Sequence, residues 1–431
     1  MDPQPPARGL LAALKETTFR SLRHRNYRLY FFGQLVSFTG SWMQNAALMW
    51  LLFDRTGDLR WPSYLLVAQV GPTVLLGTWG GALADRLPKL TLILWTQTAF
   101  LVNAVALALL VAAGFDDLPA FVLALQVFNG VVQALDLPAR LAFVPDLVPK
   151  EDLINAVGLN SLLFNSARAV GPAVTGGLFL VAGAVAHRLP WHSDPVAFGA
   201  ICCFTVNAVS YVAVLVALRA IRVPNPGGAR HPEGGSAWAG VRYLAGRPAL
   251  AGVMVCTLVV CTFGWPVLTL FPGYTRVRLG LGEESYSFLV SALGAGALVA
   301  AFVTATFGSV ERRAGFLLVG AATTAAGMFG LAEADSLRAA AGCAAVVGFG
   351  LILFLSTGQS TLQLAVPDDT RGRVMALWAV TLSASAPIGH LLAGQAAGAA
   401  GVVPVLRVMA AGLAVVAVGL AGLVARRGLR L

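Results

Sequence analysis

The chain has few charged residues and few of the residue groups that soluble enzymes use. Only 12% of its 431 residues are charged, and lysine occurs just three times, at Lys15, Lys89 and Lys150. None of these lysines follows the glycine pattern of a phosphate-binding loop or precedes Ser or Thr, which excludes an ATPase within this chain. The long apolar stretches hold no paired carboxylates, no nucleophile with an adjacent base and no metal pair. We therefore expect neither an enzyme nor a cofactor.

Cysteine is also scarce, and its positions exclude two further classes of site. The five cysteines all lie inside long apolar stretches and lack the spacing of a metal site: Cys202, Cys203, Cys256, Cys261 and Cys343. A disulfide framework is therefore not expected, and these residues are predicted to be small core residues.

Apolar residues dominate what is present. Hydrophobic residues make up 57% of the chain and the mean hydropathy is +0.76, far above the values typical of soluble proteins. Cutting the chain at its charges leaves twelve stretches long enough to span a bilayer: 29–53, 61–84, 90–115, 118–135, 153–186, 195–218, 248–275, 285–310, 314–332, 339–367, 374–403 and 408–425. Their length and short connectors favour helices over barrel strands. The predicted fold is an all-α integral membrane protein with twelve transmembrane helices.

Basic residues predict the orientation in the membrane. With the first segment placed inside, 22 of the 30 Lys and Arg residues fall in cytoplasmic segments, as the positive-inside rule requires. Both termini are then cytoplasmic, and residues 1–28 show no apolar run typical of a cleaved signal. The net charge of +10 is explained by membrane topology and anionic headgroups, so no nucleic-acid partner is expected.

One stretch divides the chain. Residues 219–248 are rich in Pro, Gly and charge, which is typical of a flexible linker, and within them Trp238 to Leu244 form a candidate amphipathic helix. The predicted organisation is a cytoplasmic segment at 1–28, a six-helix half at 29–218, this linker, a second six-helix half at 249–425 and a tail at 426–431. A Val-Pro-acidic turn occurs at Val148 and again at Val366, and a helix-interior Pro follows each about 20 residues later. This repeat favours two pseudo-symmetric halves around a central site.

Polar side chains recur at helical spacing inside four of the predicted spans. They are Gln34, Ser37, Ser41 and Gln44 in the first; Gln126, Asn129, Gln133 and Asp136 in the fourth; Ser161, Asn165 and Arg168 in the fifth; and Ser356, Gln359, Ser360 and Gln363 in the tenth. Amides facing lipid are costly, so these stripes should face the bundle interior. They either hold helices together through hydrogen bonds or line a substrate cavity.

Arg168 is the one basic residue inside a predicted span. It lies 13 residues beyond Asn155, about 20 Å along a helix and so near the membrane midplane. No Asp or Glu occurs at a similar depth in the sequence. Arg168 is either a contact for an anionic substrate group or a structural residue satisfied by amide and carbonyl oxygens.

The connector between the second and third spans resembles a known signature. Gly81, Asp85, Arg86 and Lys89 match the loop between helices 2 and 3 of the major facilitator superfamily, although Pro88 replaces the usual second Gly. In this interpretation Asp85 belongs to a conformational gate at the cytoplasmic ends of the two halves, with basic partners among Arg140, Arg371 and Arg373, and Asp136 lies nearby. The alternative is a solvated loop charge.

A second motif resembles the exporter branch of that superfamily. Gly171 and Pro172 are followed by Gly176 and Gly177 in the fifth span. Proline weakens a helix and glycine permits close helix approach, so a simple bend is the alternative. Further segments are similar to the enterobactin-exporter-like efflux branch: Arg25 to Gln34, Gly40 to Gln44, Asp136 to Arg140, Asn155 with Asn160 and Ser161, and Arg371 to Met375.

This resemblance implies a monomeric carrier in the bacterial inner membrane that exports a siderophore, a drug or another small amphipathic molecule, driven by proton exchange. His390, in the eleventh span, is a candidate proton site because it titrates near neutral pH, but a lone buried His is commonly a core residue. Coupling through Asp85 or Asp136, or no coupling, are the other possibilities. An importer and a non-transporting membrane scaffold or sensor remain as alternative functions.

Overall fold

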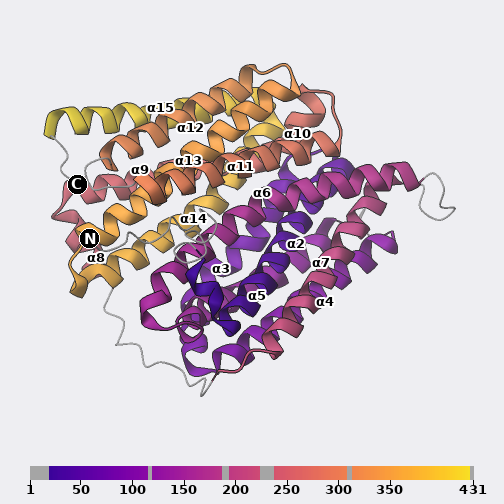
Figure 1. Cartoon of the computed structure of the whole chain (residues 1–431). Helices are drawn as coiled ribbons and strands as arrows, with labels where there is room; N and C mark the ends of the chain where they lie inside the picture. The colour runs from indigo at the N-terminus through magenta and orange to yellow at the C-terminus, as the bar shows by residue number, and fades with distance from the viewer. Residues whose placement is uncertain (1–18, 115–118, 187–193, 224–236, 308–312, 428–431) are drawn as a thin grey trace, which may run out of the picture.

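The computed structural model describes residues 19–114, 119–186, 194–223, 237–307 and 313–427 (Figure 1). The described residues form helices and no strands. The long helices are α2 (Arg25–Thr56), α3 (Arg60–Arg86), α4 (Lys89–Ala112), α5 (Pro119–Phe143), α6 (Leu153–Ala186), α7 (Pro195–Arg219), α9 (Pro248–Gly264), α11 (Glu283–Phe307), α12 (Arg313–Glu333), α13 (Leu337–Ala365), α14 (Asp368–Ala400) and α15 (Val402–Arg427).

Shorter elements accompany these helices. The 3-10 helix η1 covers Arg20–Arg23, η3 covers Val144–Asp146 and η4 covers Lys150–Asp152. Helix α8 (Ala237–Ala245) lies over the predicted amphipathic segment, and α10 (Val267–Gly273) continues into the π-helix η5 (Tyr274–Arg278). The predicted seventh span is therefore interrupted after Gly264, where Pro266 cannot donate a backbone hydrogen bond.

Ten helices in the described ranges are long and apolar enough to cross a membrane, so the chain is a multi-pass membrane protein. Helices α2 and α3, with 32 and 27 residues, are long enough but are not among these ten. The polar stripe of α2 lowers its hydropathy. Helix α5 extends to Phe143, beyond the predicted end at residue 135, and thereby brings Asp136 and Arg140 into the helix.

Helix ends have recognisable causes in the sequence. Asp194 precedes α7, and its side chain accepts hydrogen bonds from the amides of Val196 (2.8 Å) and Ala197 (3.2 Å). Ser336 similarly accepts from the amide of Ala339 at the start of α13. Gly57 ends α2 with a φ of +64°, a left-handed conformation that costs glycine little.

The helices gather into two groups that differ in colour in Figure 1. Helices α2 to α7 pack mainly on one another, and so do α8 to α15. The two groups meet along α6 and α11 and along α3 and α14. The bundle has two ends. At the Arg86 end α2 begins and α3 ends, and at the Thr56 end α2 ends and α3 begins.

Contacts between the two groups gather toward the Thr56 end. Arg276 donates to Asp54 at 2.7 Å, the ring of Trp50 stacks on Tyr286 with centroids 5.5 Å apart, and the Gln395 amide donates to the Tyr64 hydroxyl at 2.7 Å. Toward the Arg86 end, α3 and α5 line an open cavity of about 570 Å³ with Trp79 and Arg86 at its surface. These polar and aromatic contacts thus join the groups at the Thr56 end, whereas the cavity at the Arg86 end is lined by α3 and α5 of the first group.

Candidate functional site

The side chain of Arg168 projects from the middle of α6 into the surface between the two helix groups. Its guanidinium carbon lies 5.2 Å from the ring centre of Trp42 and 4.9 Å from that of Trp265. Trp42 belongs to α2, whereas Trp265 lies at the break between α9 and α10 in the other group. Cations are attracted to indole faces at such distances. The guanidinium of Arg168 therefore links the two groups by contacting one indole ring from each.

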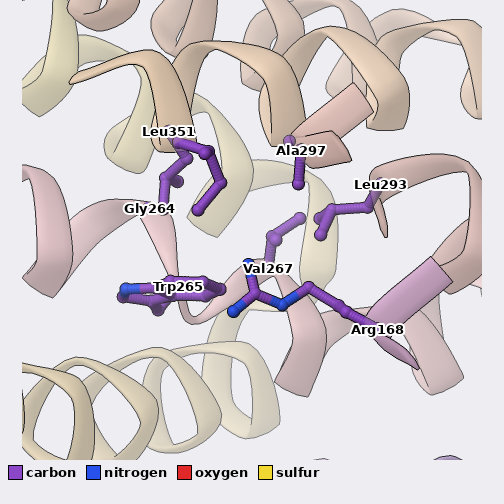
Figure 2. Close-up of a pocket in the computed structure, with 9 residues that line it drawn as sticks. Arg168, Gly264, Trp265, Val267, Leu293, Ala297 and Leu351 are labelled. Atoms are coloured by element: carbon purple, nitrogen blue, oxygen red, sulfur yellow. The ribbon is translucent and has the colours of Figure 1, made fainter. Parts of the chain in front are cut away.

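A small cavity adjoins this guanidinium. Figure 2 shows Arg168 beside Trp265, with Val267, Leu293, Ala297 and Leu351 around them. The cavity, also lined by Gly264, Gly348 and Ile352, offers about 10 Å³ to the centre of a water-sized sphere, roughly one water molecule. Its lining comes from α6, α9, α10, α11 and α13, so it lies between the groups.

The guanidinium has donors that are not used. Its Nε and Nη1 atoms are buried and have no hydrogen-bond partner, and no carboxylate pairs with Arg168 in the described ranges. The arginines Arg140 and Arg276, by contrast, pair with Asp136 and Asp54. A buried unpaired charge is expensive, which marks Arg168 as a candidate binding residue for an anion.

The glycines of the helix 5 motif allow α6 to approach its neighbours. A Cβ atom on Gly171 would lie 2.6 Å from the Trp42 Cβ, and one on Gly176 would lie 3.1 Å from the Ser287 Cβ in α11. Pro172 is buried within α6, while Gly177 faces open space. Gly171 therefore brings α6 against the helix that carries Trp42, and Gly176 brings it against the other group.

The predicted polar stripe of α2 is engaged inside the first helix group. Gln34 is fully buried and accepts a hydrogen bond from Arg140. Ser37 donates to Gln97 at 3.5 Å, and Ser41 lies 3.0 Å from the Tyr211 hydroxyl. Gln44 accepts from Asn207 at 2.8 Å. These contacts join α2 to α4, α5 and α7.

The other predicted cavity residues differ in exposure. Gln126 and Asn129 are buried, and neither amide atom of Gln126 has a hydrogen-bond partner. Gln133 and Asn165 are half-buried, and Asn165 donates to the backbone oxygen of Ser161 at 2.9 Å. In α13 the two predicted glutamines, Gln359 and Gln363, are exposed, while Ser356 and Ser360 are half-buried.

Asp136 and Arg140 form an ion pair one turn apart in α5, inside the first group. The Asp136 carboxylate also accepts from Thr96 at 2.5 Å and from Gln97 at 3.0 Å, both on α4. Arg140 reaches Gln34 on α2 and lies 4.6 Å from the centre of the Phe38 ring. Asp136 is 1% exposed and Arg140 is 8% exposed, so this pair is buried and does not lie in a solvated loop.

The remaining predicted gate residues are distributed over several contacts. Lys89 donates to Asp146 at 2.8 Å within the first group, while Arg86 is exposed at the large open cavity and Gly81 has open space where a Cβ would lie. The side chain of Asp85 lies outside the described residues. In the second group, Arg371 donates to the Val366 carbonyl at 3.2 Å, and the Arg373 side chain is half-buried.

His390 is buried in α14, with its Nδ1 atom 2.8 Å from the Thr269 hydroxyl on α10. It thus lies in the second group, away from the buried pair of Asp136 and Arg140 in the first.

The sequence did not predict two residues and one cluster that the structure shows. Trp42 and Trp265 have no helical spacing that relates them to Arg168, because they come from different helix groups. The third is a cluster around Asp152, a fully buried residue that pairs with Arg20, Arg23 and His24. Its only sequence signal is a basic segment and an acidic turn more than 120 residues apart.

A bundle of long apolar helices in two groups, with the half-buried Arg168 between them, is the architecture of a polytopic membrane transporter. The family model described as MFS_3, transmembrane secretion effector, matches residues 16–427. The chain therefore belongs to the transmembrane secretion effector family of major facilitator superfamily transporters.

The relatives compared with this chain are distant transport proteins. The chain is 25% identical over 374 residues to the enterobactin exporter EntS of Shigella boydii, with 86% of this chain and 85% of that protein covered. It is 23% identical to the macrolide efflux protein A of Streptococcus pyogenes, with 88% and 92% covered. The staphyloferrin A transporter of Staphylococcus aureus is 23% identical, and the match spans 64% of this chain and 66% of that protein, just under two thirds of its length.

Solved structures support the same fold. A bacterial homologue of the iron transporter ferroportin in its inward-facing state has a TM-score of 0.69 and 15% identity, with 93% of this chain and 99% of that chain covered. In its outward-facing state the TM-score is 0.59, at 16% identity and with 93% and 100% covered.

Proposed function

We propose that the protein is a secondary active transporter that exports a small amphipathic or anionic molecule across the bacterial inner membrane. The observation that carries this proposal is Arg168, whose unpartnered donors lie between the two helix groups. A charged hydrogen-bond donor at a membrane midplane is a functional residue by default. The likeness to an enterobactin exporter and a macrolide efflux protein supports export of a siderophore-like product or a drug.

Alternating access is the proposed mechanism. In this proposal α2 to α7 form the first half at 29–218 and α9 to α15 form the second half at 249–425, with twelve spans in all and residues 219–248 as the linker. Carriers built in this way rock the two halves around a central site. The contacts near Thr56 and the open cavity near Arg86 support an inward-open state.

The Arg86 end is proposed to be cytoplasmic. Most Lys and Arg residues of the connecting segments fall at this end, which agrees with the positive-inside rule and places both termini in the cytoplasm. A substrate then enters from the cytoplasm through the open cavity and reaches Arg168 at the closed contact. Rocking widens the small cavity, because its lining comes from both groups.

The gate is proposed to form when the Arg86 end closes. A Cβ atom on Gly81 would have no neighbour within 4 Å, and Arg86 is exposed at the open cavity. Both residues can therefore contact the second half near Arg371 and Arg373. Asp85 would accept from one of these arginines or from a helix N-terminus.

Proton antiport is the proposed coupling, and two buried residues are candidates for the proton site. The candidates are Asp136 and His390; protonation of Asp136 would leave the buried guanidinium of Arg140 without its counter-charge, so a proton there would require Arg140 to find another partner. His390 contacts the hydroxyl of Thr269, which suits a hydrogen-bonded core residue.

The experiment compares the small molecules in cells and medium of the native host with and without the gene, under iron limitation and with toxic amphipaths. Deletion should cause the cells to retain one anionic compound, and the wild-type gene should restore its release. Arg168→Gln should lower the export rate about 10–100-fold, because a charge-assisted hydrogen bond contributes about 1.5–3 kcal/mol. Arg168→Lys should restore only part of the rate, because lysine lacks the planar fork.

Arg407→Gln is the matched control, since Arg407 is an exposed cation that pairs with Glu333 in the second group, and it should export at the wild-type rate. Wild-type export by Arg168→Gln at equal membrane abundance would remove Arg168 from the mechanism. Loss of uptake on deletion would make the protein an importer, and ligand binding without flux would indicate a sensor.

A further inference from the structure

We infer that the cavity beside Arg168 holds one monatomic anion of the size of chloride while the two helix groups are closed at the Thr56 end. This anion is distinct from the proposed transport substrate, although both would bind Arg168, and the inference stands on the geometry of the cavity alone. It predicts an inorganic ligand that regulates which conformation the protein adopts.

Charge balance is the first argument. An arginine side chain stays protonated in proteins. The two aromatic rings that flank the Arg168 guanidinium are both indoles. Indole faces attract a cation but do not neutralise it. Leaving a buried charge without a partner costs several kcal/mol, and the other buried guanidinium of the first group, that of Arg140, has the Asp136 carboxylate. A small anion would supply the missing charge at Arg168.

The size and lining of the cavity provide the second argument. Its volume of about 10 Å³ for the centre of a water-sized sphere accommodates about one water or one monatomic ion. An organic carboxylate or phosphate with its substituents would not fit in this conformation. A substrate therefore cannot be the occupant before the groups separate.

The lining also favours an anion over water. A buried water usually makes two to four hydrogen bonds and must both donate and accept. Val267, Leu293, Ala297 and Leu351 offer no acceptor from their side chains, while Arg168 offers only donors. A halide needs donors alone, and the Nε and Nη1 atoms are two buried donors without a partner.

The position of the site links the anion to conformation. Arg168 comes from α6, whereas the cavity walls come from α9, α10, α11 and α13 of the second group. An anion held there contacts both groups and stabilises their closed arrangement. By linkage, a ligand that binds one conformation raises its population. Separation of the groups, or an anionic group of a substrate, would then displace it.

The first test measures thermal unfolding of the purified full-length protein in lipid nanodiscs, in sodium chloride and in sodium gluconate at equal ionic strength. Chloride should raise the midpoint by about 1–3 °C. The rise should be absent in Arg168→Gln and present in Arg407→Gln. Arg407 is the matched control because it is an exposed cation that pairs with Glu333 inside the second group and takes no part in the contacts between the groups.

A second measurement does not depend on the stability of a variant. Wild-type crystals grown in sodium bromide should show one anomalous scattering peak beside the Arg168 guanidinium. Three results would each overturn the inference and leave a water in the cavity. They are equal midpoints in the two salts, a chloride response that persists in Arg168→Gln, and crystals grown in bromide that lack the peak.

The transport assay separates this inference from the proposed function. Export that depends on Arg168 but is identical in chloride and gluconate, with no bromide peak, would remove the anion site and keep the carrier. A chloride response in a protein that does not export would keep the anion site and remove the proposed carrier function.

Discussion

At the scale of single residues, the buried Arg140 and the half-buried Arg168 of the first group differ in how their charge is satisfied. Arg140 has a carboxylate, an amide oxygen and an aromatic face, whereas Arg168 has two aromatic faces and unused donors. The first arrangement holds α2, α4 and α5 together. The second leaves binding capacity at the surface where the halves meet, which is where a carrier needs it.

The pair of Asp136 and Arg140 should be a stability element. Arg140→Gln leaves the Asp136 carboxylate buried without its partner, so we expect a loss of about 3–5 kcal/mol in the free energy of unfolding. The double variant Asp136→Asn with Arg140→Gln should recover part of this loss, since it removes both charges. Denaturant unfolding in detergent, analysed as a double-mutant cycle, measures the coupling.

The control for this pair lies at the surface. Arg407 and Glu333 are 54% and 46% exposed, so Arg407→Gln should cost less than about 1 kcal/mol. If the single variants at Asp136 and Arg140 cost no more than that, the buried pair does not stabilise the first group.

At the scale of elements, α6 packs against other elements in its middle, and the turn before its start binds the segment that precedes α2. In its middle and toward the Thr56 end, Gly171 and Gly176 allow contact with α2 and α11. At its start, Asp152 in η4 binds the segment 20–24. The Asp152 carboxylate accepts from Arg23 at 2.8 Å and lies 2.6 Å from His24, and its backbone oxygen accepts from Ser21 at 3.0 Å. The segment before α2 is thus docked on the helix that carries Arg168.

Asp152→Asn should loosen this docked segment. The amide cannot balance the charges of Arg20 and Arg23, so trypsin should cleave after these residues about 10-fold faster, as expected for a loss of about 1.4 kcal/mol in local stability. Mass spectrometry of timed digests of the full-length protein gives the rates. Glu151→Gln is the control, because the Glu151 side chain is exposed and its backbone oxygen, which accepts from Arg20, is unchanged. Equal cleavage in the two variants would show that the carboxylate of Asp152 does not hold the segment.

At the scale of the whole molecule, closure at the Thr56 end rests on small residues. A Cβ on Gly294 of α11 would lie 2.6 Å from the Ala169 Cα, and one on Gly394 of α14 would lie 2.5 Å from the Ser63 Cβ. Such contacts require the two groups to fit closely, yet few strong polar bonds join them. A surface of this kind can separate and close repeatedly, which alternating access requires.

Cross-linking α6 to α11 should stop transport. With Gly176→Cys and Ser287→Cys, the Cβ atoms would be 3.1 Å apart, slightly closer than the roughly 3.5–4.5 Å of a disulfide. A small outward shift of either helix would allow the bond. Oxidation should abolish export and reductant should restore it, as measured by substrate flux from vesicles.

The two single-cysteine variants are the controls, since they report any effect of oxidant on the five native cysteines. Undiminished flux from fully cross-linked protein would mean that α6 and α11 do not separate during the cycle.

The sequence by itself determined the membrane class, the approximate positions of the long helices and the family. Hydropathy and signature loops are local properties, so they could be read without knowing how helices pack. The position of Arg168 in the middle of a long helix also followed from the sequence. The predicted end of the fourth span at residue 135 was too early, because α5 continues to Phe143 and includes Asp136.

Only the tertiary structure decided which residues meet. It placed Trp42 and Trp265 on the faces of Arg168, paired Lys89 with Asp146 and docked Arg23 on Asp152. Each of these contacts joins segments that are distant in the chain or belong to different helix groups. They depend on the rotation and crossing of packed helices, which many distant contacts set together. For this reason the candidate residue was visible in the sequence, whereas its binding site was not.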